Sequence, residues 1–181
     1  ILSNVSYNTV LNDELRKTYA PVIDQMNRFI PRMMLRKIPK ANVQQAFVLD
    51  SVYKFTKNKK LPRILCVGSY EDTAAESLKM IGFSIEEIDP SINFDLETFF
   101  NLPTTKKSYY DIIFSTSVLE HVKDDELFIS QIAQLLIPGG VCILTCDYND
   151  NYKPGEKLPE TDLRFYTKKD FIERLIPNAN E

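Results

Sequence analysis

The sequence predicts an α/β domain in which a mostly parallel sheet carries helices on both faces. Short continuous apolar runs, typical of strands that are buried on both sides, occur at "RILCVG", "YYDIIFST" and "VCILTCDY". Segments of helical periodicity stand between them, so the order along the chain is strand, helix, strand. This alternation favours a doubly wound sheet whose ligands bind outside the carboxyl ends of the strands.

Residues 1–60 hold no strand-like run and are expected to form an N-terminal helical extension or lid. Apolar residues from Val22 to Ile30 follow helical spacing, with Pro21 suited to the first turn. A second helix is expected over residues 43–55, ended by the basic turn "TKNKKLP". The main domain is therefore expected to span residues 61–181.

Strands and helices alternate within this main domain. After the strand "RILCVG", a helix is expected over "TAAESLKMIGF", where Thr73 and Glu76 have capping-box spacing. "FSIEEIDP" predicts a second strand, and "YYDIIFSTSVLEHV" contains a third. "DDELFISQIAQLLIPGG" predicts an amphipathic helix closed by Pro138, Gly139 and Gly140. The strand "VCILTCDY" and a last helical stretch, "TKKDFIERL", follow.

Composition argues against several functional classes. A net charge of −3 provides no polybasic signature of nucleic-acid binding. No apolar run approaches the roughly 20 residues that cross a bilayer, and no signal-peptide layout is present, so a soluble cytoplasmic protein is expected. The three cysteines lie in strand-like segments and are expected to be reduced core residues. One histidine and scattered carboxylates predict no metal site.

The turn after the first strand indicates a ligand that contains a ribose. Gly68 would let the backbone pass close under a ligand, although any tight turn from strand to helix also favours glycine. Asp89 ends the second strand 21 positions later, the spacing of an acid that binds ribose hydroxyls. A nicotinamide dinucleotide and an S-adenosyl ligand both contain such a ribose.

Charge separates these two ligands. A dinucleotide places an anionic pyrophosphate at the helix N-terminus, where this chain has Glu71 and Asp72. Two carboxylates repel pyrophosphate but attract a ligand that carries a sulfonium and an ammonium group. On a second interpretation the carboxylates only complement the helix dipole. Both interpretations disfavour a nicotinamide dinucleotide.

Six segments carry a resemblance to a known family. They follow one another within about residues 61–175 as "ILCVGSYEDT", "IEEIDPS", "FDLETFFNLP", "YYDIIFSTSVLEHV", "LLIPGGVCILT" and "DLRFYTKKDFIERL". Together they resemble the class I S-adenosylmethionine-dependent methyltransferases, specifically the small-molecule group with a "VLEHV"-type fourth strand.

The resemblance implies a Rossmann-like fold and S-adenosylmethionine as cofactor. It implies that Asp89 binds the ribose, that Asp95 approaches the adenine, and that the end of the family's fourth strand lines the methionine part, here Ser115, Thr116 and Ser117. The loop in the place of the first motif contributes Gly68, Ser69, Tyr70 and Asp72. The family's last two strands should follow "FIERL", so the C-terminal strands of the fold are expected to be missing from this sequence.

The first motif departs from the family pattern. Cys66 stands where an acidic residue is usual, and Tyr70 and Asp72 stand where glycines are usual. Tyr70 either lies over the cofactor or fills its pocket. Only five residues, which include "SINF", lie between Asp89 and Asp95, so the helix usual between the second and third strands is expected to be almost absent.

His121 is the best single candidate for a catalytic residue. As a general base it would take the proton of a hydroxyl acceptor; the alternative is a residue at a helix entry that bonds the local backbone. Asp147 and Tyr148 are weaker candidates for the substrate side, or simply terminate a strand. The basic residues of "RFIPRMMLRKIPK" either receive an anionic acceptor or form a solvated helix face.

Two functions from different classes follow. The first is transfer of a methyl group from S-adenosylmethionine to an O or N of a small molecule, such as a saccharide or secondary metabolite. The alternative is a non-catalytic, methyltransferase-like binding or scaffold protein, motivated by the altered glycine loop. A nucleotide-dependent oxidoreductase is disfavoured by the acidic loop. The expected partner is a small-molecule acceptor, with neither nucleic acid nor membrane, and the oligomeric state is not predicted.

Overall fold

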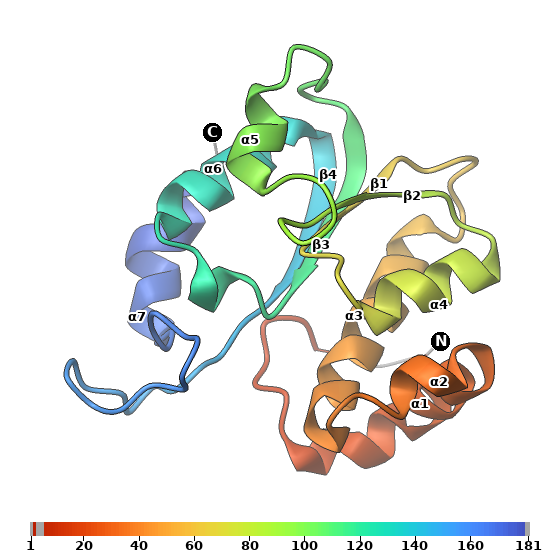
Figure 1. Ribbon diagram of the computed structural model, residues 1–181, viewed down its shortest axis with the longest axis horizontal. Helices are drawn as coiled ribbons and strands as arrows, with labels where there is room; N and C mark the ends of the chain where they lie inside the picture. The colour runs from red at the N-terminus through yellow and green to blue at the C-terminus, as the bar shows by residue number, and fades with distance from the viewer. Residues whose placement is uncertain (1, 3–5, 180–181) are drawn as a thin grey trace.

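Four parallel strands form one sheet in the computed structural model, which describes residue 2 and residues 6–179 (Figure 1). The strands are β1 (Ile64–Val67), β2 (Ile85–Ile88), β3 (Tyr110–Thr116) and β4 (Leu136–Thr145), in the order β2-β1-β3-β4. Each neighbouring pair of these strands runs parallel. The carboxyl ends of the strands therefore meet at one edge of the sheet, and the predicted fold class is confirmed.

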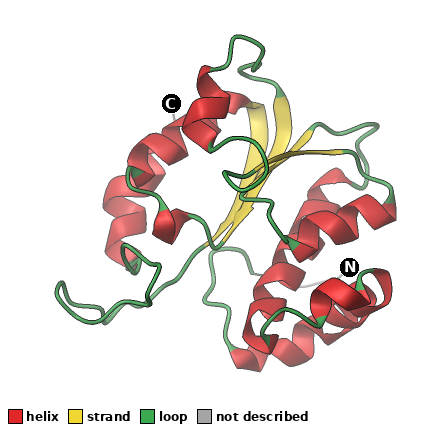
Figure 2. Ribbon diagram, viewed as in Figure 1, coloured by secondary structure: helices red, strands yellow, loops and turns green. Residues whose placement is uncertain are grey.

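Helices cover both faces of the sheet (Figure 2). One face carries α1 (Arg16–Phe29), α3 (Pro39–Thr56) and α4 (Thr73–Ile81), and the short α2 (Pro31–Met34) links α1 to α3. The opposite face carries α5 (Leu96–Asn101), α6 (Asp125–Leu135) and a C-terminal helical run of α7 (Lys168–Asp170), the π-helical turn η3 (Phe171–Leu175) and α8 (Ile176–Asn178). The length and polarity of the described helices do not suit a membrane span.

Alternate residues of the central strands pack into two separate hydrophobic cores. In β1, Ile64 and Cys66 pack under α1, α3 and α4, whereas Leu65 and Val67 pack under α5 and α6. Successive side chains of a strand point to opposite faces, so a strand covered on both sides must be apolar throughout. This is the physical reason that "ILCV" is a continuous apolar run. All three cysteines are free; Cys66 is buried in the core, whereas Cys142 and Cys146 are partly buried.

Two N-terminal helices begin earlier than the sequence predicts. α1 begins at Arg16, so the prediction that Pro21 lies in its first turn is wrong. Asn12 caps a preceding 3-10 turn, η1 (Asp13–Leu15), by accepting a hydrogen bond from the Glu14 N–H, and this turn leads directly into α1. Pro21 is tolerated at an exposed position. α3 begins at Pro39, which takes the first-turn place that suits proline.

The segment "LIPGG" belongs to a strand and does not close a helix. α6 ends at Leu135, and β4 begins at the next residue. The Tyr109 N–H donates to the Leu135 carbonyl at 2.8 Å, which joins the end of α6 to the start of β3. The register then shifts between Tyr110 and Ile112, and Gly139 adopts a φ of +77°. Glycine here permits an irregularity in the edge strand rather than a helix cap.

The helix expected to be almost absent between β2 and β3 is short but present. α5 has six residues and is capped by Asp95, whose Oδ1 accepts the Thr98 N–H at 2.7 Å. Leu96 and Phe99 are buried against the core beneath it. The capping carboxylate and these two apolar contacts together stabilise a helix of less than two turns.

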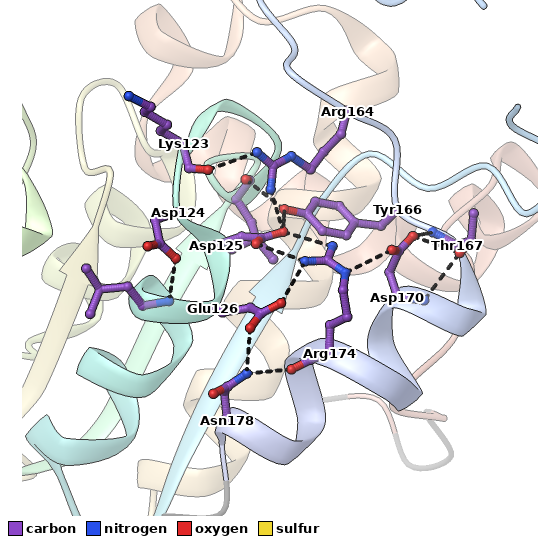
Figure 3. Close-up of polar contacts among 12 residues, drawn as sticks. Lys123, Asp124, Asp125, Glu126, Arg164, Tyr166, Thr167, Asp170, Arg174 and Asn178 are labelled. Atoms are coloured by element: carbon purple, nitrogen blue, oxygen red, sulfur yellow. Dashed lines mark hydrogen bonds and ion pairs between the residues drawn. The ribbon is translucent and has the colours of Figure 1, made fainter. Parts of the chain in front are cut away.

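A buried carboxylate joins the C-terminal part of the chain to α6 (Figure 3). The Asp125 side chain is 5% exposed and accepts two hydrogen bonds from Arg174, each at 3.1 Å. Arg164 forms an ion pair with it at 2.6 Å, and the Tyr166 hydroxyl lies at 2.9 Å. Burial alone would raise the pKa of Asp125, but these hydrogen bonds outweigh burial and lower it. The loop before α7 and the C-terminal helical run are thereby held against α6.

Replacing Asp125 with Asn should lower the free energy of unfolding by about 2–4 kcal/mol, because it leaves two arginines without their buried counter-charge. Urea unfolding at pH 7 measures the difference. The folded-state pKa of Asp125 lies below its ordinary value of 3.8. The stabilisation by the ionised carboxylate is therefore fully present above pH 3.8 and is lost as the pH falls through the folded-state pKa.

Asp124→Asn is the matched control for this variant. The Asp124 carboxylate caps α6 through the Leu127 N–H at 2.9 Å, and Asn caps helices about as well as Asp. The control should therefore stay within about 0.5 kcal/mol of the wild type. Equal destabilisation by the two substitutions would contradict the role given to Asp125.

Candidate functional site

A cleft of about 1110 Å³ opens at the carboxyl edge of the sheet. Its volume lies slightly above the range of pockets that hold small ligands, which is roughly 300–1,000 Å³. Eight of the ten site residues expected from the sequence line it: Gly68, Tyr70, Asp72, Asp89, Asp95, Thr116, Ser117 and His121. The other two, Ser69 and Ser115, are 5% and 1% exposed and lie beneath the lining.

Gly68 is required by packing within the protein. Its φ is +81°, and its N–H donates to the Ile88 carbonyl at 2.8 Å, which ties the turn to β2. A Cβ at this position would lie 2.2 Å from Cγ2 of Val118, the second residue after the end of β3. The close approach that the glycine permits is therefore to Val118.

Tyr70 does not fill the cleft. The residue is 60% exposed, so its ring lies at the rim. Its backbone N–H donates to Oδ2 of Asp89 at 3.1 Å. The loop after β1 and the acid after β2 are thus joined directly, through an amide group that any residue other than proline would supply.

Asp72, rather than Thr73, caps α4. Its Oδ1 accepts the Ala75 N–H at 2.7 Å, and its Oδ2 accepts from Nε2 of Gln45 at 3.1 Å. The expected capping box of Thr73 and Glu76 is wrong, because the chain enters the helix one residue earlier. Burial raises the pKa of Asp72 although these two hydrogen bonds oppose it. Asp72 is 3% exposed, and its carboxyl group contacts α3 through Gln45.

Two adjacent glutamines of α3 hold the loops that surround the cleft. Oε1 of Gln45 accepts the Ala74 N–H at 2.8 Å, in addition to the bond from its Nε2 to Asp72. Nε2 of Gln44 lies 2.8 Å from Oγ of Ser117 and 2.7 Å from Oγ1 of Thr145, so it bridges the ends of β3 and β4. Sequence reasoning missed both residues, since a helical glutamine has no local signature.

The segment between α2 and α3 reaches the loop after β1. Nη2 of Arg36 lies 2.8 Å from Oε1 of Glu71, and Nζ of Lys37 lies 3.9 Å from Oε2. Glu71 has a φ of +52°, which is uncommon for a residue other than glycine. Two of the expected acceptor-binding cations therefore face a carboxylate of the chain itself, and they offset one of the two charges that the sequence places at this loop.

Asp89 and Asp95 project where the chain leaves β2. Besides the bond from Tyr70, Asp89 accepts the Ser91 N–H at 2.7 Å. Asp95 is exposed, and its bonds with Thr98 lower its pKa. A carboxylate has about four acceptor positions, so both retain capacity for a ligand's hydroxyl or amino groups.

The lining of the cleft is strongly acidic. It contains two lysines, Lys37 and Lys123, against eight carboxyl residues: Glu71, Asp72, Asp89, Asp95, Glu97, Asp124, Asp125 and Glu126. Ion pairs offset the charges of Glu71 and Asp125, as described above. Beneath the lining, Oγ of Ser69 and Oγ1 of Thr73 are buried without a hydrogen-bond partner among the described residues. The site thus combines a negative potential with unused polar atoms.

His121 lies in the short 3-10 turn η2 (Leu119–His121) beyond β3, on the cleft wall. Its Nδ1 is 3.0 Å from the Thr161 carbonyl and 3.4 Å from Oδ1 of Asp162. Its side chain is 41% exposed. Of the weaker candidates, Tyr148 pairs with Tyr166 in an isolated bridge, whereas Asp147 faces Asp162.

Glu120, next to His121, is 1% exposed, and its Oε2 has no hydrogen-bond partner in the described part of the chain. The pKa of Glu120 is raised to about 7, mainly by burial; Asp147 and Asp162 act in the same direction, and His121 opposes them. Burial and contact with Asp162 also raise the pKa of Asp147. Within residues 6–179, no group of three His, Cys, Asp or Glu side chains is arranged to hold a metal ion.

Comparison with known proteins identifies the family. A family described as a methyltransferase domain matches residues 34–174. The chain belongs to this methyltransferase family. Its open parallel sheet and helical N-terminus agree with the class I, Rossmann-like fold expected from the sequence. The narrower "VLEHV"-type group stays a prediction.

Two solved structures, those of SpnF and CurJ, support the fold of this methyltransferase domain. The [4+2]-cyclase SpnF matches 91% of the chain, over 69% of its own length, with 15% identity and a TM-score of 0.53. The CurJ carbon methyltransferase matches 75% of the chain, over 50% of its own, with 15% identity and a TM-score of 0.51. YcgJ from Bacillus subtilis matches 56%, over 51% of its own, with 15% identity and a TM-score of 0.43. The chain thus spans about half the length of CurJ and YcgJ.

Gly68→Ala should destabilise the domain more than Gly155→Ala does. Both glycines have positive φ, +81° and +97°, so both substitutions strain the backbone. A Cβ at Gly155 meets nothing within 4 Å, whereas the one at Gly68 meets Val118. Overpacking should add about 1–3 kcal/mol to the loss at Gly68, measured by urea unfolding. If a double-mutant cycle with Val118→Ala shows no favourable coupling, the packing argument is wrong.

Glu120→Gln should flatten the pH dependence of stability. The folded-state pKa of about 7 lies above the ordinary 4.5, so the folded protein binds the proton more tightly and loses stability as the pH rises between these values. The variant keeps a neutral group and should lose less stability from pH 5 to pH 8 than the wild type. Urea unfolding at both values, with the exposed Asp24→Asn as control, measures this. Parallel pH profiles for Glu120→Gln and the wild type would refute it.

Proposed function

We propose that this domain binds S-adenosylmethionine in the acidic cleft and transfers its methyl group to an O or N atom of a small molecule. The observation that carries the proposal is the acidic lining at the carboxyl edge of the parallel sheet, in a chain that belongs to a methyltransferase family. A positively charged donor suits such a lining, because a negative potential attracts cations and repels phosphates.

The polar groups around the cleft fit the proposed cofactor. Asp89 would accept the ribose hydroxyls with the acceptor capacity it retains, and the exposed Asp95 would accept from the adenine amino group. The methionine part would lie against the loops after β1 and β3, at Gly68, Ser69, Tyr70, Asp72, Ser115, Thr116 and Ser117. The buried hydroxyls of Ser69 and Ser115, which lack partners among the described residues, favour a polar ligand here.

When bound, the cofactor supplies a methyl group on a positively charged sulfur, whose departure as a thioether needs no proton donor. The protein then has to hold the acceptor atom in line with the methyl group and the sulfur. Gln44 holds the loop after β3 against the end of β4 through its bonds with Ser117 and Thr145, and this would keep the loop beside the acceptor in place. His121 would take the proton of a hydroxyl or amine acceptor.

A non-catalytic binding role is the second candidate, and one specific observation favours it. Gly68 is explained by its contact with Val118, so the glycine that survives in the first loop does not by itself require a ligand. The [4+2]-cyclase SpnF is similar in fold, so the fold does not by itself require methyl transfer. Cofactor binding distinguishes the candidates, because a scaffold without cofactor would give no heat of binding.

Asp89→Asn should weaken the binding of S-adenosylmethionine and of S-adenosylhomocysteine at least tenfold, the loss expected for one charged hydrogen bond to the ribose. Isothermal titration calorimetry on the wild type and the variant measures it. Asn retains one acceptor oxygen for the loop, and Asp24→Asn, with the same change in net charge at an exposed site of α1, should bind as the wild type does. Folded wild type that binds neither compound at millimolar concentration would contradict the proposal.

A further inference from the structure

Three carboxyl groups from separate segments gather behind His121. Glu120 comes from the turn after β3, Asp147 from the segment that follows β4, and Asp162 from the loop that returns toward α7. The backbone N–H of Leu163 donates to the Glu120 carbonyl at 2.9 Å, which fixes that loop against the turn. Glu120 and the Asp162 side chain are 1% and 5% exposed, and each has one oxygen without a partner among the described residues.

Other charged and titratable groups around this cluster are few. The Cys146 thiol faces Glu120 from the end of β4, and its pKa is raised by burial and by the carboxyls, so it stays neutral. Lys40, from the start of α3, acts on Asp147. His121 itself faces all three carboxyls. Apart from this effect of Lys40, no lysine or arginine of the described residues forms an ion pair with the three carboxyls, so a charged imidazole would be their nearest counter-charge.

The contacts of His121 determine its tautomer. Nδ1 lies 3.0 Å from the Thr161 carbonyl, which can only accept, so Nδ1 must carry the hydrogen. In the neutral imidazole this leaves the lone pair on Nε2, which has no hydrogen-bond partner among the described residues. The ring belongs to the wall of the cleft. A basic nitrogen is thus available to a ligand there.

We propose that Glu120, Asp147 and Asp162 are positioning residues for His121, which orient its ring and compensate its charge when Nε2 accepts a proton from the methyl acceptor. In that step the acceptor's O–H or N–H bond breaks, its electron pair stays on the acceptor, and the proton forms a bond with Nε2. The imidazolium then faces Asp162 at 3.4 Å with the other two carboxyls behind it. This rests on the proposed function for the source of the proton.

Nuclear magnetic resonance of ¹⁵N-labelled histidine tests the orientation directly. His121 is the one histidine among the 181 residues, so a chain purified without a histidine tag needs no assignment. The neutral ring should show a protonated Nδ1 and an unprotonated Nε2. A neutral ring protonated mainly at Nε2 would overturn the proposal, because that nitrogen could not accept a proton.

Titration of the same signals tests the charge compensation. Asp162→Asn should lower the pH midpoint of the imidazole titration by roughly 0.5–1 pH unit, because it removes the negative charge nearest the ring. Glu120→Gln should lower the midpoint by less, because Glu120 itself holds a proton over part of the same pH range. Asp24→Asn should leave the midpoint unchanged. Asp147→Asn replaces either variant that fails to fold. Unchanged midpoints in the folded variants would overturn the proposal, since residues that only support the fold would not alter the titration.

These experiments test the proposed cofactor binding and the proposed role of the three carboxyls independently. Calorimetry with S-adenosylmethionine on the wild-type sample decides whether the cofactor binds, and it does not depend on the state of His121. The resonance data decide the arrangement behind His121 without any cofactor. An imidazole with the opposite tautomer in a protein that binds the cofactor would remove this inference and leave the proposed function intact.

Discussion

The parallel direction of all four strands is the constraint on which the rest of the structure depends. Parallel strands bring every carboxyl end to one edge, and the loops that leave this edge must satisfy their own polar groups or leave them for a ligand. Here the Gly68 and Ser69 amides reach back to β2, and Gln44 bridges β3 to β4. The cleft is the space that remains between these tied loops.

Charge at this edge is distributed in two distinct ways. Carboxylates that serve the fold are paired, as Asp125 is with Arg164 and Arg174, or Glu71 with Arg36. Those around β2 accept backbone amides and retain unused acceptor positions, as Asp89 and Asp95 do. Because the first kind is neutralised locally, the second kind leaves unpaired negative charge at the cleft. The acidic residues of the sequence are therefore not equivalent, although their spacing alone cannot separate them.

Local patterns predicted the strands well, because a strand covered on both faces is apolar throughout and Gly68 and Asp89 mark where β1 and β2 end. Contacts between distant segments could not be predicted. The glutamines of α3 lie 27 to 101 positions from their partners, and the pairs of Arg36 with Glu71 and of Arg174 with Asp125 are 35 and 49 positions apart. The prediction that the glycines of β4 close a helix was wrong, since glycine with a positive φ occurs both at strand irregularities and at helix caps. The prediction that Pro21 lies in the first turn of α1 was wrong, because a capped turn further upstream begins the helix.

The most direct measurement of the central claim is a crystal structure of the protein grown with S-adenosylhomocysteine. The account predicts continuous density for an adenosyl group in the cleft, with the ribose hydroxyls about 2.6–3.2 Å from the Asp89 carboxylate and the amino-acid part against the loops after β1 and β3. Density for the ligand elsewhere, or a cleft closed by the Tyr70 ring with no space for the nucleoside, would contradict it.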